Sequence, residues 1–219
     1  MTDQEILSRV DHTLLKAAAS WGEIKTICDE AVRYKTASVC IPPAYVRQVL
    51  AEYGAEYGKN PVICTVIGFP LGYSCTAAKA FETEAALRDG ASEIDMVINI
   101  GDVKNGRFNT VLGEIYIVKN ICENKILKII VETCYLTEEE KIRLCGIVTE
   151  AGADFIKTST GFGPSGAAIA DVELFARHIG PNVKIKAAGG IKTREEMTAF
   201  IEAGAARLGT SSAVKILKE

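Results

Sequence analysis

The sequence has few of the patterns that bind metals or form disulfides. Its 219 residues include only two histidines, and its seven cysteines are scattered without a Cys-x-x-Cys pair. A structural zinc site needs clustered cysteine and histidine ligands, and a disulfide framework is typical of small secreted chains with an even cysteine count. The sequence therefore predicts neither, and the odd number of thiols fits a reducing cytosol.

Long apolar runs and clusters of basic residues are missing too. The longest apolar runs, such as residues 62–67, are too short to span a bilayer, and the acidic N-terminus is unlike a secretory signal. The net charge of −3 comes without a basic run or tail, which argues against nucleic acid and anionic membrane as partners. We expect a cytoplasmic protein that acts on a small molecule.

Short β-branched or apolar runs alternate with longer amphipathic stretches along the whole chain, which predicts repeated βα units and a parallel sheet. Eight units of roughly 27 residues fill the sequence, and no linker or composition shift divides it. We predict an α/β fold, a single (β/α)8 TIM barrel over residues 1–219, with an open doubly wound sheet as the competing architecture. Its strands are expected near residues 10–15, 36–41, 62–68, 93–98, 127–132, 154–158, 183–187 and 207–209.

Helix ends are marked by hydroxyl residues and glycines. Thr137 and Thr193 are each followed three residues later by a glutamate, as in a capping box. The predicted N-caps are Ser20, Ser74, Thr137 and Thr193, and the glycines expected at helix C-termini are Gly54, Gly90, Gly152 and Gly204.

Polar side chains occupy inward positions of strands that should otherwise be apolar. They lie near the C-terminal strand ends, where barrel enzymes assemble their sites. One such residue is more often a paired core charge, but a set drawn from six or seven strands favours a closed barrel, since an open sheet gathers its ligand groups at one crevice. The set comprises Asp11, Thr13, Cys40, Asp95, Lys128, Glu132, Lys157 and Lys186.

Lysines on the fifth, sixth and seventh strands would meet an aspartate of the fourth around one axis. Two ammonium groups that lie close together in a partly desolvated site depress each other's pKa, from about 10.4 toward 7–8, which yields free amine at neutral pH. Such an amine can form a Schiff base. Glu93 and Lys184 lie two residues earlier on their strands, and we expect them to form a structural pair one layer deeper. His12 has the opposite parity and is expected to pack outward.

Two loops predict a phosphate site. Gly189 and Gly190 follow the seventh strand, Gly209 with Ser211 and Ser212 follows the eighth, and each loop is expected to run directly into a helix. These are the loops in which barrel enzymes most often hold a phosphate. Either glycine motif alone would more often be a plain turn, but together they predict a phosphoester substrate.

A third glycine motif, residues 161–166, matches G-x-G-x-x-G after a strand. It contains Pro164, and the next strand ends without an acid that could hold a ribose hydroxyl. We therefore expect no dinucleotide cofactor, and interpret Gly161 as an additional phosphate contact.

Six segments, in order over nearly the whole chain, closely resemble deoxyribose-phosphate aldolases of the short bacterial type. They are residues 11–16, 68–70, 93–101, 155–162, 184–191 and 208–211. The resemblance implies a class I aldolase without metal or cofactor. It would cleave 2-deoxy-D-ribose 5-phosphate reversibly to D-glyceraldehyde 3-phosphate and acetaldehyde, in deoxyribonucleoside catabolism. A homo-oligomer, with a dimer favoured, is expected at the level of the family.

The resemblance also implies roles for individual residues. Lys157 would form the Schiff base, Lys186 would be the second lysine that activates it, and Asp95 would move protons through a bound water. The substrate-binding residues would be Asp11, Thr13, Cys40, Lys128 and Thr160, with Lys128 acting electrostatically. The phosphate contacts would be Gly161, Gly189, Gly190, Gly209, Ser211 and Ser212.

Two positions depart from the family pattern, and two alternative functions stay open. Pro42 stands where relatives often have an asparagine, and no tyrosine follows Tyr135, whereas some longer relatives end in a tyrosine that assists proton transfer. A different Schiff-base sugar-phosphate aldolase or a transaldolase-like enzyme would keep the lysines and change the substrate. A non-catalytic sugar-phosphate-binding barrel would keep the glycine loops without needing Lys157 and Lys186 together.

Overall fold

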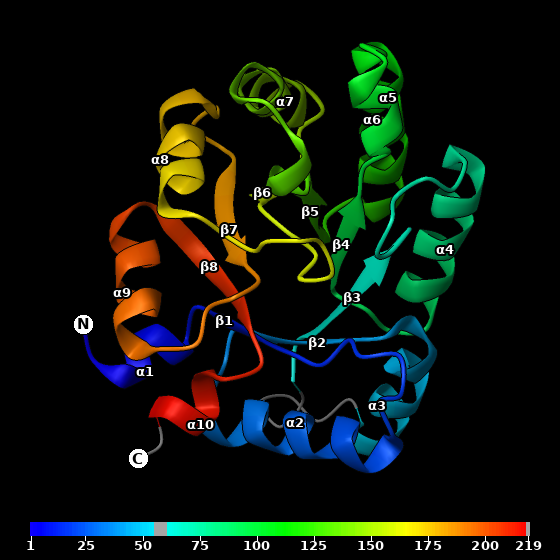
Figure 1. Cartoon of the computed structure of the whole chain (residues 1–219). Coiled ribbons are helices and arrows are strands. Elements are labelled where there is room, and N and C mark those ends of the chain that lie inside the picture. The colour runs from blue at the N-terminus through cyan, green and yellow to red at the C-terminus, as the bar shows by residue number, and fades with distance from the viewer. Residues whose placement is uncertain (55–60, 218–219) are drawn as a thin grey trace.

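Eight parallel strands close into a barrel (Figure 1). The computed structural model describes residues 1–54 and 61–217, so Lys218 and Glu219 of the tail compared above lie outside the described residues. Each strand pairs with the next in the chain, and β8 pairs with β1. The strands are β1 Val10–Thr13, β2 Ser38–Ile41, β3 Ile63–Ile67, β4 Glu93–Val97, β5 Ile126–Ile130, β6 Phe155–Lys157, β7 Lys184–Ala188 and β8 Ala205–Thr210. The closed barrel is confirmed, and the open sheet is excluded.

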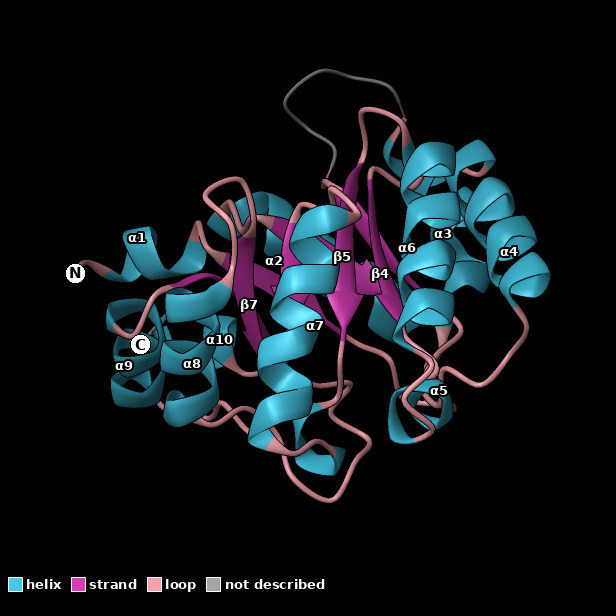
Figure 2. Ribbon diagram, turned by 90° about the horizontal axis from the view of Figure 1, so that it is seen from above, coloured by secondary structure: helices cyan, strands magenta, loops and turns pink. Residues whose placement is uncertain are grey.

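Helices surround the strands on the outside of the barrel (Figure 2). They are α1 Asp3–Leu7, α2 Trp21–Tyr34, α3 Val46–Tyr53, α4 Thr76–Arg88, α5 Ile100–Lys104, α6 Phe108–Cys122, α7 Glu138–Glu150, α8 Ile169–His178, α9 Arg194–Glu202 and α10 Ala213–Leu217. Two 3-10 helices, η1 Pro43–Tyr45 and η2 Thr133–Tyr135, follow β2 and β5. Within the described part of the chain, every helix is too short or too polar to cross a bilayer.

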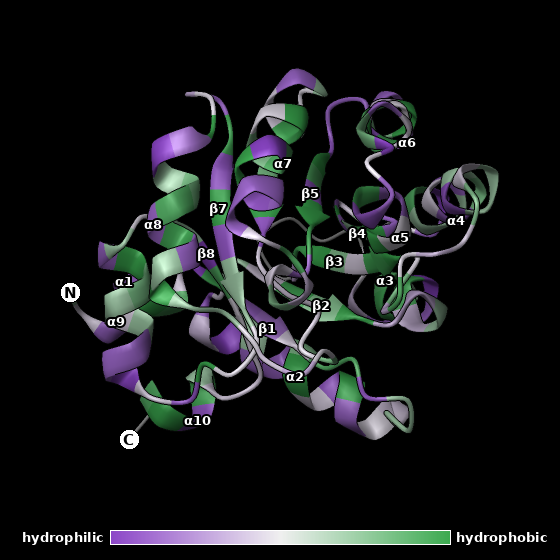
Figure 3. Ribbon diagram, turned by 45° about the horizontal axis from the view of Figure 1, so that its top comes forward, coloured by the Kyte–Doolittle hydropathy of each residue, from purple (hydrophilic) through white to green (hydrophobic). Residues whose placement is uncertain are grey.

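The main hydrophobic core lies between the strands and this helical layer. Outward-facing strand residues such as Ile41, Ile94 and Ile156 are fully buried in it. Helices such as α7 and α8 carry both hydrophobic and hydrophilic bands in Figure 3, as expected for helices with one face on a core and one in water. The alternating positions of the strands therefore point into the barrel, which directs the polar set toward its axis.

Helix caps agree with the sequence at three of the four predicted N-caps. Ser20, Thr137 and Thr193 each form a complete capping box, the first with Glu23. Ser74 is wrong as an N-cap: Cys75 takes the extended N-cap conformation one residue later, and α4 begins at Thr76. At the C-termini, Gly54 is the cap of α3. The other three predicted glycines each follow the cap residue with a positive φ, as at Gly90 (φ 114°).

Strand ends differ from the predicted ranges by a few residues, and two differences affect the site. β5 ends at Ile130, and Glu132 beyond it has a left-handed backbone (φ 56°). The alternation of the strand therefore no longer determines where the Glu132 side chain points. β8 begins at Ala205, which places Arg207 inside the strand.

Candidate active site

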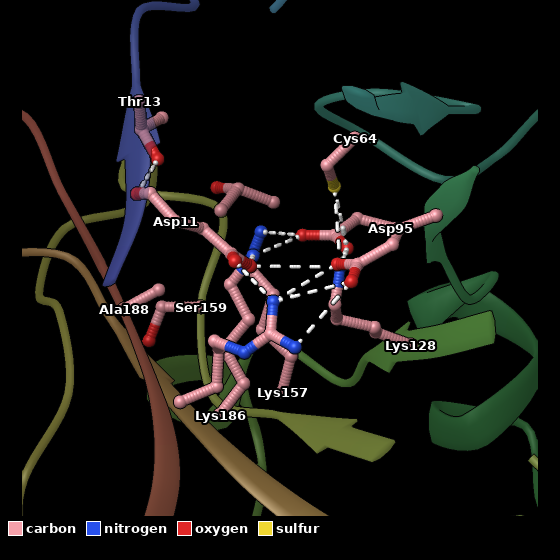
Figure 4. A network of polar contacts seen from close by, with 12 residues as sticks. Asp11, Thr13, Cys64, Asp95, Lys128, Lys157, Ser159, Lys186 and Ala188 are labelled. Carbon is pink, nitrogen blue, oxygen red and sulfur yellow. Dashed lines mark hydrogen bonds and ion pairs between the residues drawn. The ribbon is translucent and has the colours of Figure 1, made fainter. Parts of the chain in front are cut away.

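Seven charged side chains from six strands meet inside the barrel, and Figure 4 shows most of them converging. Their register is set by direct pairing of neighbouring strands: Asp95 of β4 lies opposite Lys128 of β5, and Lys157 of β6 lies opposite Lys186 of β7. We call this set the charged cluster: Asp11, Glu93, Asp95, Lys128, Lys157, Lys186 and Arg207.

Asp95 is the centre of the charged cluster. Its Oδ2 lies 2.7 Å from Lys157 Nζ and 2.6 Å from Lys186 Nζ, and its Oδ1 lies 2.8 Å from Lys128 Nζ. Burial alone would raise the pKa of Asp95, but the three ammonium groups outweigh it and hold the pKa well below its ordinary value. Asp95 is therefore an anion that accepts hydrogen bonds from three lysines.

Asp11 of β1 and Glu93 of β4 are the other two carboxylates of the charged cluster. Asp11 accepts hydrogen bonds from Lys186 Nζ, from Ser38 Oγ at 2.6 Å and from Arg207 Nη1 at 2.5 Å. Glu93 Oε2 lies 2.6 Å from Lys128 Nζ and 3.0 Å from Arg207 Nη1.

The expected Glu93–Lys184 pair is wrong. Lys184 is the exposed first residue of β7, and its ammonium lies 5.9 Å from the centroid of the Phe155 ring. Strand parity correctly indicated that Glu93 faces inward, but it could not indicate which cation reaches that depth. Lys128 and Arg207 do so.

Lys128 and Lys186, the two fully buried lysines of the charged cluster, keep their protons. Burial would lower the pKa of Lys128 and of Lys186, but the carboxylates of Asp11 and Asp95 outweigh it and raise both values. The predicted mutual lowering of lysine pKa values is therefore wrong for Lys186, because the sequence argument left out the carboxylates between the ammonium groups. Lys186 is a permanent cation close to Lys157.

A cavity of about 510 Å³ opens over the charged cluster, at the C-terminal ends of β1, β6, β7 and β8. We call it the catalytic hollow. Of the seven clustered side chains, Lys157 alone lines it, and that side chain is 4% exposed. The predicted site residues that line it are Thr13, Lys157, Thr160, Gly161, Gly189, Gly190, Gly209, Ser211 and Ser212.

The remaining predicted site residues lie outside the lining of the hollow. Asp11, Asp95, Lys128 and Lys186 are fully buried in the charged cluster. Cys40 is also fully buried and belongs to a small apolar cluster with Cys64 and Val66, so the geometry does not support direct substrate contact at this thiol. Cys64 was not predicted as a site residue, but its Sγ lies 3.2 Å from Asp95 Oδ1 and 3.2 Å from Lys128 Nζ.

The loops that follow β6 and β7 approach each other closely where Gly161 and Gly189 line the hollow, which we call its far end. A Cβ on Gly166 would lie 2.2 Å from the Gly189 carbonyl oxygen, so only glycine fits there. Gly189 has φ 88°, a conformation that also favours glycine. Ser212 directly precedes α10, as predicted, but α9 begins at Arg194, so the Gly189–Gly190 pair does not run directly into a helix.

A model of the DeoC/LacD family aldolases matches residues 5–217. The chain belongs to the DeoC/LacD family of aldolases. It is 60% identical over 218 residues to a deoxyribose-phosphate aldolase of Clostridium botulinum, covering 100% of this chain and 97% of the relative. It is 58% identical over 219 residues to one of Streptococcus pyogenes, covering 100% and 96%.

Solved structures of similar proteins agree with this family. A putative deoxyribose-phosphate aldolase from Coccidioides immitis superposes with a TM-score of 0.94 at 37% identity, over 100% of this chain and 86% of the other. The deoxyribose phosphate aldolase from Aeropyrum pernix, described as a tetramer, gives 0.88 at 30% identity, over 99% and 91%. The predicted resemblance and the barrel fold are thus confirmed.

Further residues of this aldolase site escaped the sequence analysis. Lys16 and Lys192 line the catalytic hollow, and the Lys16 ammonium lies 2.5 Å from Glu23 Oε1. Lys16 ends the segment 11–16, and Lys192 directly follows the segment 184–191, so these positions were the available signal. Arg207 also belongs to the charged cluster. The eighth strand was predicted, but only Gly209 and the serines after it were assigned a role in the site.

Glu132 anchors the loop that follows Lys157 through hydrogen bonds. Its buried carboxylate accepts hydrogen bonds from the backbone N–H of Thr160 at 3.1 Å and from the Thr160 hydroxyl. The same hydroxyl accepts a hydrogen bond from the backbone N–H of Phe162 at 3.0 Å. Glu132 therefore fixes the loop that begins directly after Lys157.

Pro42 and His12 lie away from the catalytic hollow. Pro42 lines a neighbouring cavity of about 260 Å³, bounded mainly by apolar groups, which shares Leu15 and Phe162 with the hollow. His12 packs outward as predicted, with Nε2 2.8 Å from Glu30 Oε2.

Two buried trios have donor atoms within 4.8 Å of one another, Cys40–Cys64–Asp95 and Asp11–Cys64–Glu93. Their carboxylates already bind Lys128, Lys186 or Arg207. A metal ion would have to displace these cations from a region that holds four of them.

Proposed function

We propose that the chain is a class I aldolase that cleaves 2-deoxy-D-ribose 5-phosphate reversibly to D-glyceraldehyde 3-phosphate and acetaldehyde, through an imine on Lys157. The observation that carries the proposal is the position of Lys157: its amine is 2.7 Å from Asp95 and is the one clustered amine that lines the catalytic hollow. The names of the full-length relatives support the substrate.

The reaction begins when the Lys157 amine attacks the aldehyde carbon C1 of the open-chain sugar. The carbinolamine loses water to give a protonated imine, which withdraws electrons from the neighbouring carbon atoms. Loss of the proton from the C3 hydroxyl then breaks the C2–C3 bond, its electron pair forms an enamine, and glyceraldehyde 3-phosphate leaves as the aldehyde. Protonation of the enamine at C2 and hydrolysis release acetaldehyde and free Lys157.

Asp95 transfers the protons of this cycle, and Lys186 stabilises its negative charge. Asp95 is an anion in contact with Lys157, so it accepts the C3 hydroxyl proton, directly or through a water, and returns it to C2. Lys186 lies 2.6 Å from Asp95 and stays charged, which stabilises the anionic carboxylate between proton transfers.

The phosphate of the substrate binds at the far end of the catalytic hollow. Gly161, Gly189, Gly190 and Gly209 permit close approach to backbone N–H groups there, and Ser211 and Ser212 add hydroxyl donors. Lys192 supplies positive charge to the same region. Thr13 and Thr160 also line the hollow and would contact the sugar hydroxyls.

The protonated imine supplies the electron withdrawal for which class II aldolases use a metal ion, so we propose catalysis without metal or cofactor. We also infer a cytoplasmic homo-oligomer, with a dimer favoured. The described chain exposes Leu71, Tyr73 and Phe81 near the start of α4, and one related structure is described as tetrameric. Light scattering on the purified protein tests the oligomeric state.

An aldol assay in both directions tests the substrate. Purified protein should release acetaldehyde from 2-deoxy-D-ribose 5-phosphate and should make that sugar from acetaldehyde and glyceraldehyde 3-phosphate. Lys157→Met should abolish both reactions, and Lys184→Met, which removes an exposed lysine of β7, should abolish neither. Transfer of a three-carbon ketone donor without acetaldehyde formation would instead identify a transaldolase-like enzyme. An inert protein that still binds sugar phosphates would identify a non-catalytic barrel.

A further inference from the structure

Cys40 and Cys64 form a pair of thiols that the proposed reaction does not use. Both are fully buried, on the neighbouring strands β2 and β3, where they are direct partners in the register. Their Sγ atoms lie within 4.8 Å of each other. Directly paired residues of neighbouring strands have Cα atoms about 4.8 Å apart, and a disulfide needs a separation of roughly 4.4–6.8 Å. The two thiols can therefore be joined by a disulfide without a change in strand pairing.

The apolar cavity beside the catalytic hollow gives a small molecule access to these thiols. Leu15, Val66 and Phe69 pack around the two cysteines, and the same three residues line that cavity of about 260 Å³. The thiols thus lie one layer of side chains beneath it. Leu15 and Phe69 are only partly buried, so a rotation of either side chain opens a path for a molecule the size of hydrogen peroxide.

The surroundings of the two thiols give them different reactivity. The hydrogen bond with the Cys64 thiol lowers the pKa of Cys40 against the opposing effect of burial, and the Lys186 ammonium adds to this lowering. Burial instead raises the pKa of Cys64 well above its ordinary value. Because the thiolate is the form that attacks an oxidant, Cys40 reacts first and Cys64 supplies the second thiol.

A disulfide at this position would act directly on the proposed active site. Cys64 Sγ lies 3.2 Å from Asp95 Oδ1 and 3.2 Å from Lys128 Nζ (Figure 4). As a thiol it can donate a hydrogen bond to Asp95, whereas a disulfide sulfur has no hydrogen to donate. Asp95 in turn lies 2.7 Å from Lys157 Nζ. Oxidation of Cys64 therefore removes a donor from the carboxylate that contacts the reacting amine.

We propose that Cys40 and Cys64 are a peroxide-sensitive pair, which hydrogen peroxide converts into a disulfide that reversibly inhibits the aldolase. All seven cysteines are free thiols in the structure, so the disulfide is the oxidised state of a protein that is otherwise reduced. A thiol reductant reverses the change by exchange. The inhibition rests on the proposed function, in which Asp95 serves Lys157, whereas formation of the disulfide does not depend on it.

The oxidation proceeds in two balanced steps. The Cys40 thiolate attacks one oxygen of the peroxide, the O–O bond breaks, and hydroxide leaves a sulfenic acid behind and takes up the proton that Cys40 released. The Cys64 sulfur then attacks the Cys40 sulfur, the S–S bond forms and the S–O bond breaks, and the Cys64 proton leaves with the hydroxyl group as water. The two thiols are oxidised, and the peroxide is reduced to two molecules of water.

Peptide mapping of the peroxide-treated protein tests the pair. The purified protein is treated with hydrogen peroxide, the remaining thiols are alkylated, and disulfide-linked peptides are identified by mass spectrometry. We expect a Cys40–Cys64 link, a roughly tenfold lower kcat for 2-deoxy-D-ribose 5-phosphate cleavage, and recovery of thiols and activity with dithiothreitol. The control Cys75→Ser with Cys134→Ser removes the two cysteines that are not buried and should leave both the link and the inhibition unchanged.

Two single variants separate the roles of the thiols. Cys64→Ser cannot form the link, so the Cys40 sulfenic acid should persist and be trapped by dimedone. Prolonged treatment of this variant should carry Cys40 to sulfinic acid, which dithiothreitol does not reverse. Cys40→Ala lacks the thiol that reacts first, so peroxide should leave its kcat close to that of the untreated variant. Circular dichroism on each variant verifies that it is folded.

Three outcomes would overturn the inference. Inhibition of the wild type without a Cys40–Cys64 link, or equal inhibition of Cys40→Ala, would show that oxidation acts elsewhere. A complete link that leaves kcat unchanged would show that the pair does not control the site. A protein that forms the link but is inactive before treatment would instead refute the proposed function, so the two failures are distinguishable.

Discussion

At the scale of single residues, the proposed chemistry depends on a lysine amine held against an anionic carboxylate inside a buried network of charges. The inward parity of Asp95, Lys157 and Lys186 could be read from the chain, and the structure joins them within 2.7 Å. Glu93 was assigned to the wrong lysine, and Arg207 was missed. Both errors have one cause. Strand parity predicts whether a side chain points into the barrel, but its partner depends on its position along the barrel axis and on the length of the side chain.

Glu132 gives a first prediction at this scale. Glu132→Gln replaces one acceptor oxygen by an amide group that cannot accept the second Thr160 hydrogen bond, and a lost hydrogen bond to a buried charged group is worth about 1.5–3 kcal/mol. We expect the KM for 2-deoxy-D-ribose 5-phosphate to rise roughly tenfold or more, because the loop after Lys157 loses its anchor. Steady-state kinetics test this against Glu139→Gln, an exposed control on α7. An unchanged KM would show that the loop does not need the carboxylate.

A second prediction concerns metal ions. The carboxylates that could bind one are held by lysine and arginine side chains, and an imine replaces the Lewis acid. Dialysis against a chelator should leave kcat for sugar cleavage unchanged, and added Zn²⁺, Mn²⁺ or Co²⁺ should not raise it. Activity that disappears on chelation and returns with one of these ions would indicate class II chemistry.

At the scale of helices and strands, prediction succeeded where local chemistry decides the structure. All eight strands were located, since apolar runs between helix caps mark them, and three of four N-caps were identified. The short helix α5, the 3-10 helices and the left-handed turn at Glu132 were not predicted, because tertiary contacts rather than local pattern determine such short elements.

The N-caps provide a matched pair of variants. Thr137→Ala removes the hydroxyl that accepts from the backbone N–H of Glu140, and the loss of such a cap costs about 1 kcal/mol. Ser74→Ala removes a hydroxyl from a predicted cap that the structure does not form, so its effect should be only a few tenths of that. Urea denaturation measures both free energies of unfolding, and equal effects would contradict the assigned start of α4.

At the scale of the whole molecule, the charged cluster links stability to pH at both extremes. The pKa values of Asp11 and Asp95 are lowered in the folded protein, so their stabilising contribution is present above the ordinary value of 3.8 and is lost as the pH falls below it. Those of Lys128 and Lys186 are raised, so their contribution is present below 10.5 and is lost as the pH rises above it. Burial raises the pKa of the Cys28 and Cys122 thiols from 9.0 to about 12, which favours the unfolded state above pH 9.

The free energy of unfolding should therefore be nearly constant between about pH 4 and pH 9 and should fall on either side. Urea denaturation at a series of pH values measures it. A steep decrease between pH 6 and pH 8 would show that a charge of the cluster titrates with folding in the neutral range, against the assignment of fixed charges to Asp95 and Lys186.

Chemical trapping tests the central role of Lys157 most directly. The enzyme is treated with borohydride in the presence of 2-deoxy-D-ribose 5-phosphate or acetaldehyde, and the modified lysine is located by peptide mass spectrometry. We predict loss of activity together with a single two-carbon adduct on Lys157 when acetaldehyde is used. A stable adduct on Lys186 or Lys128, or full activity after treatment, would contradict the account.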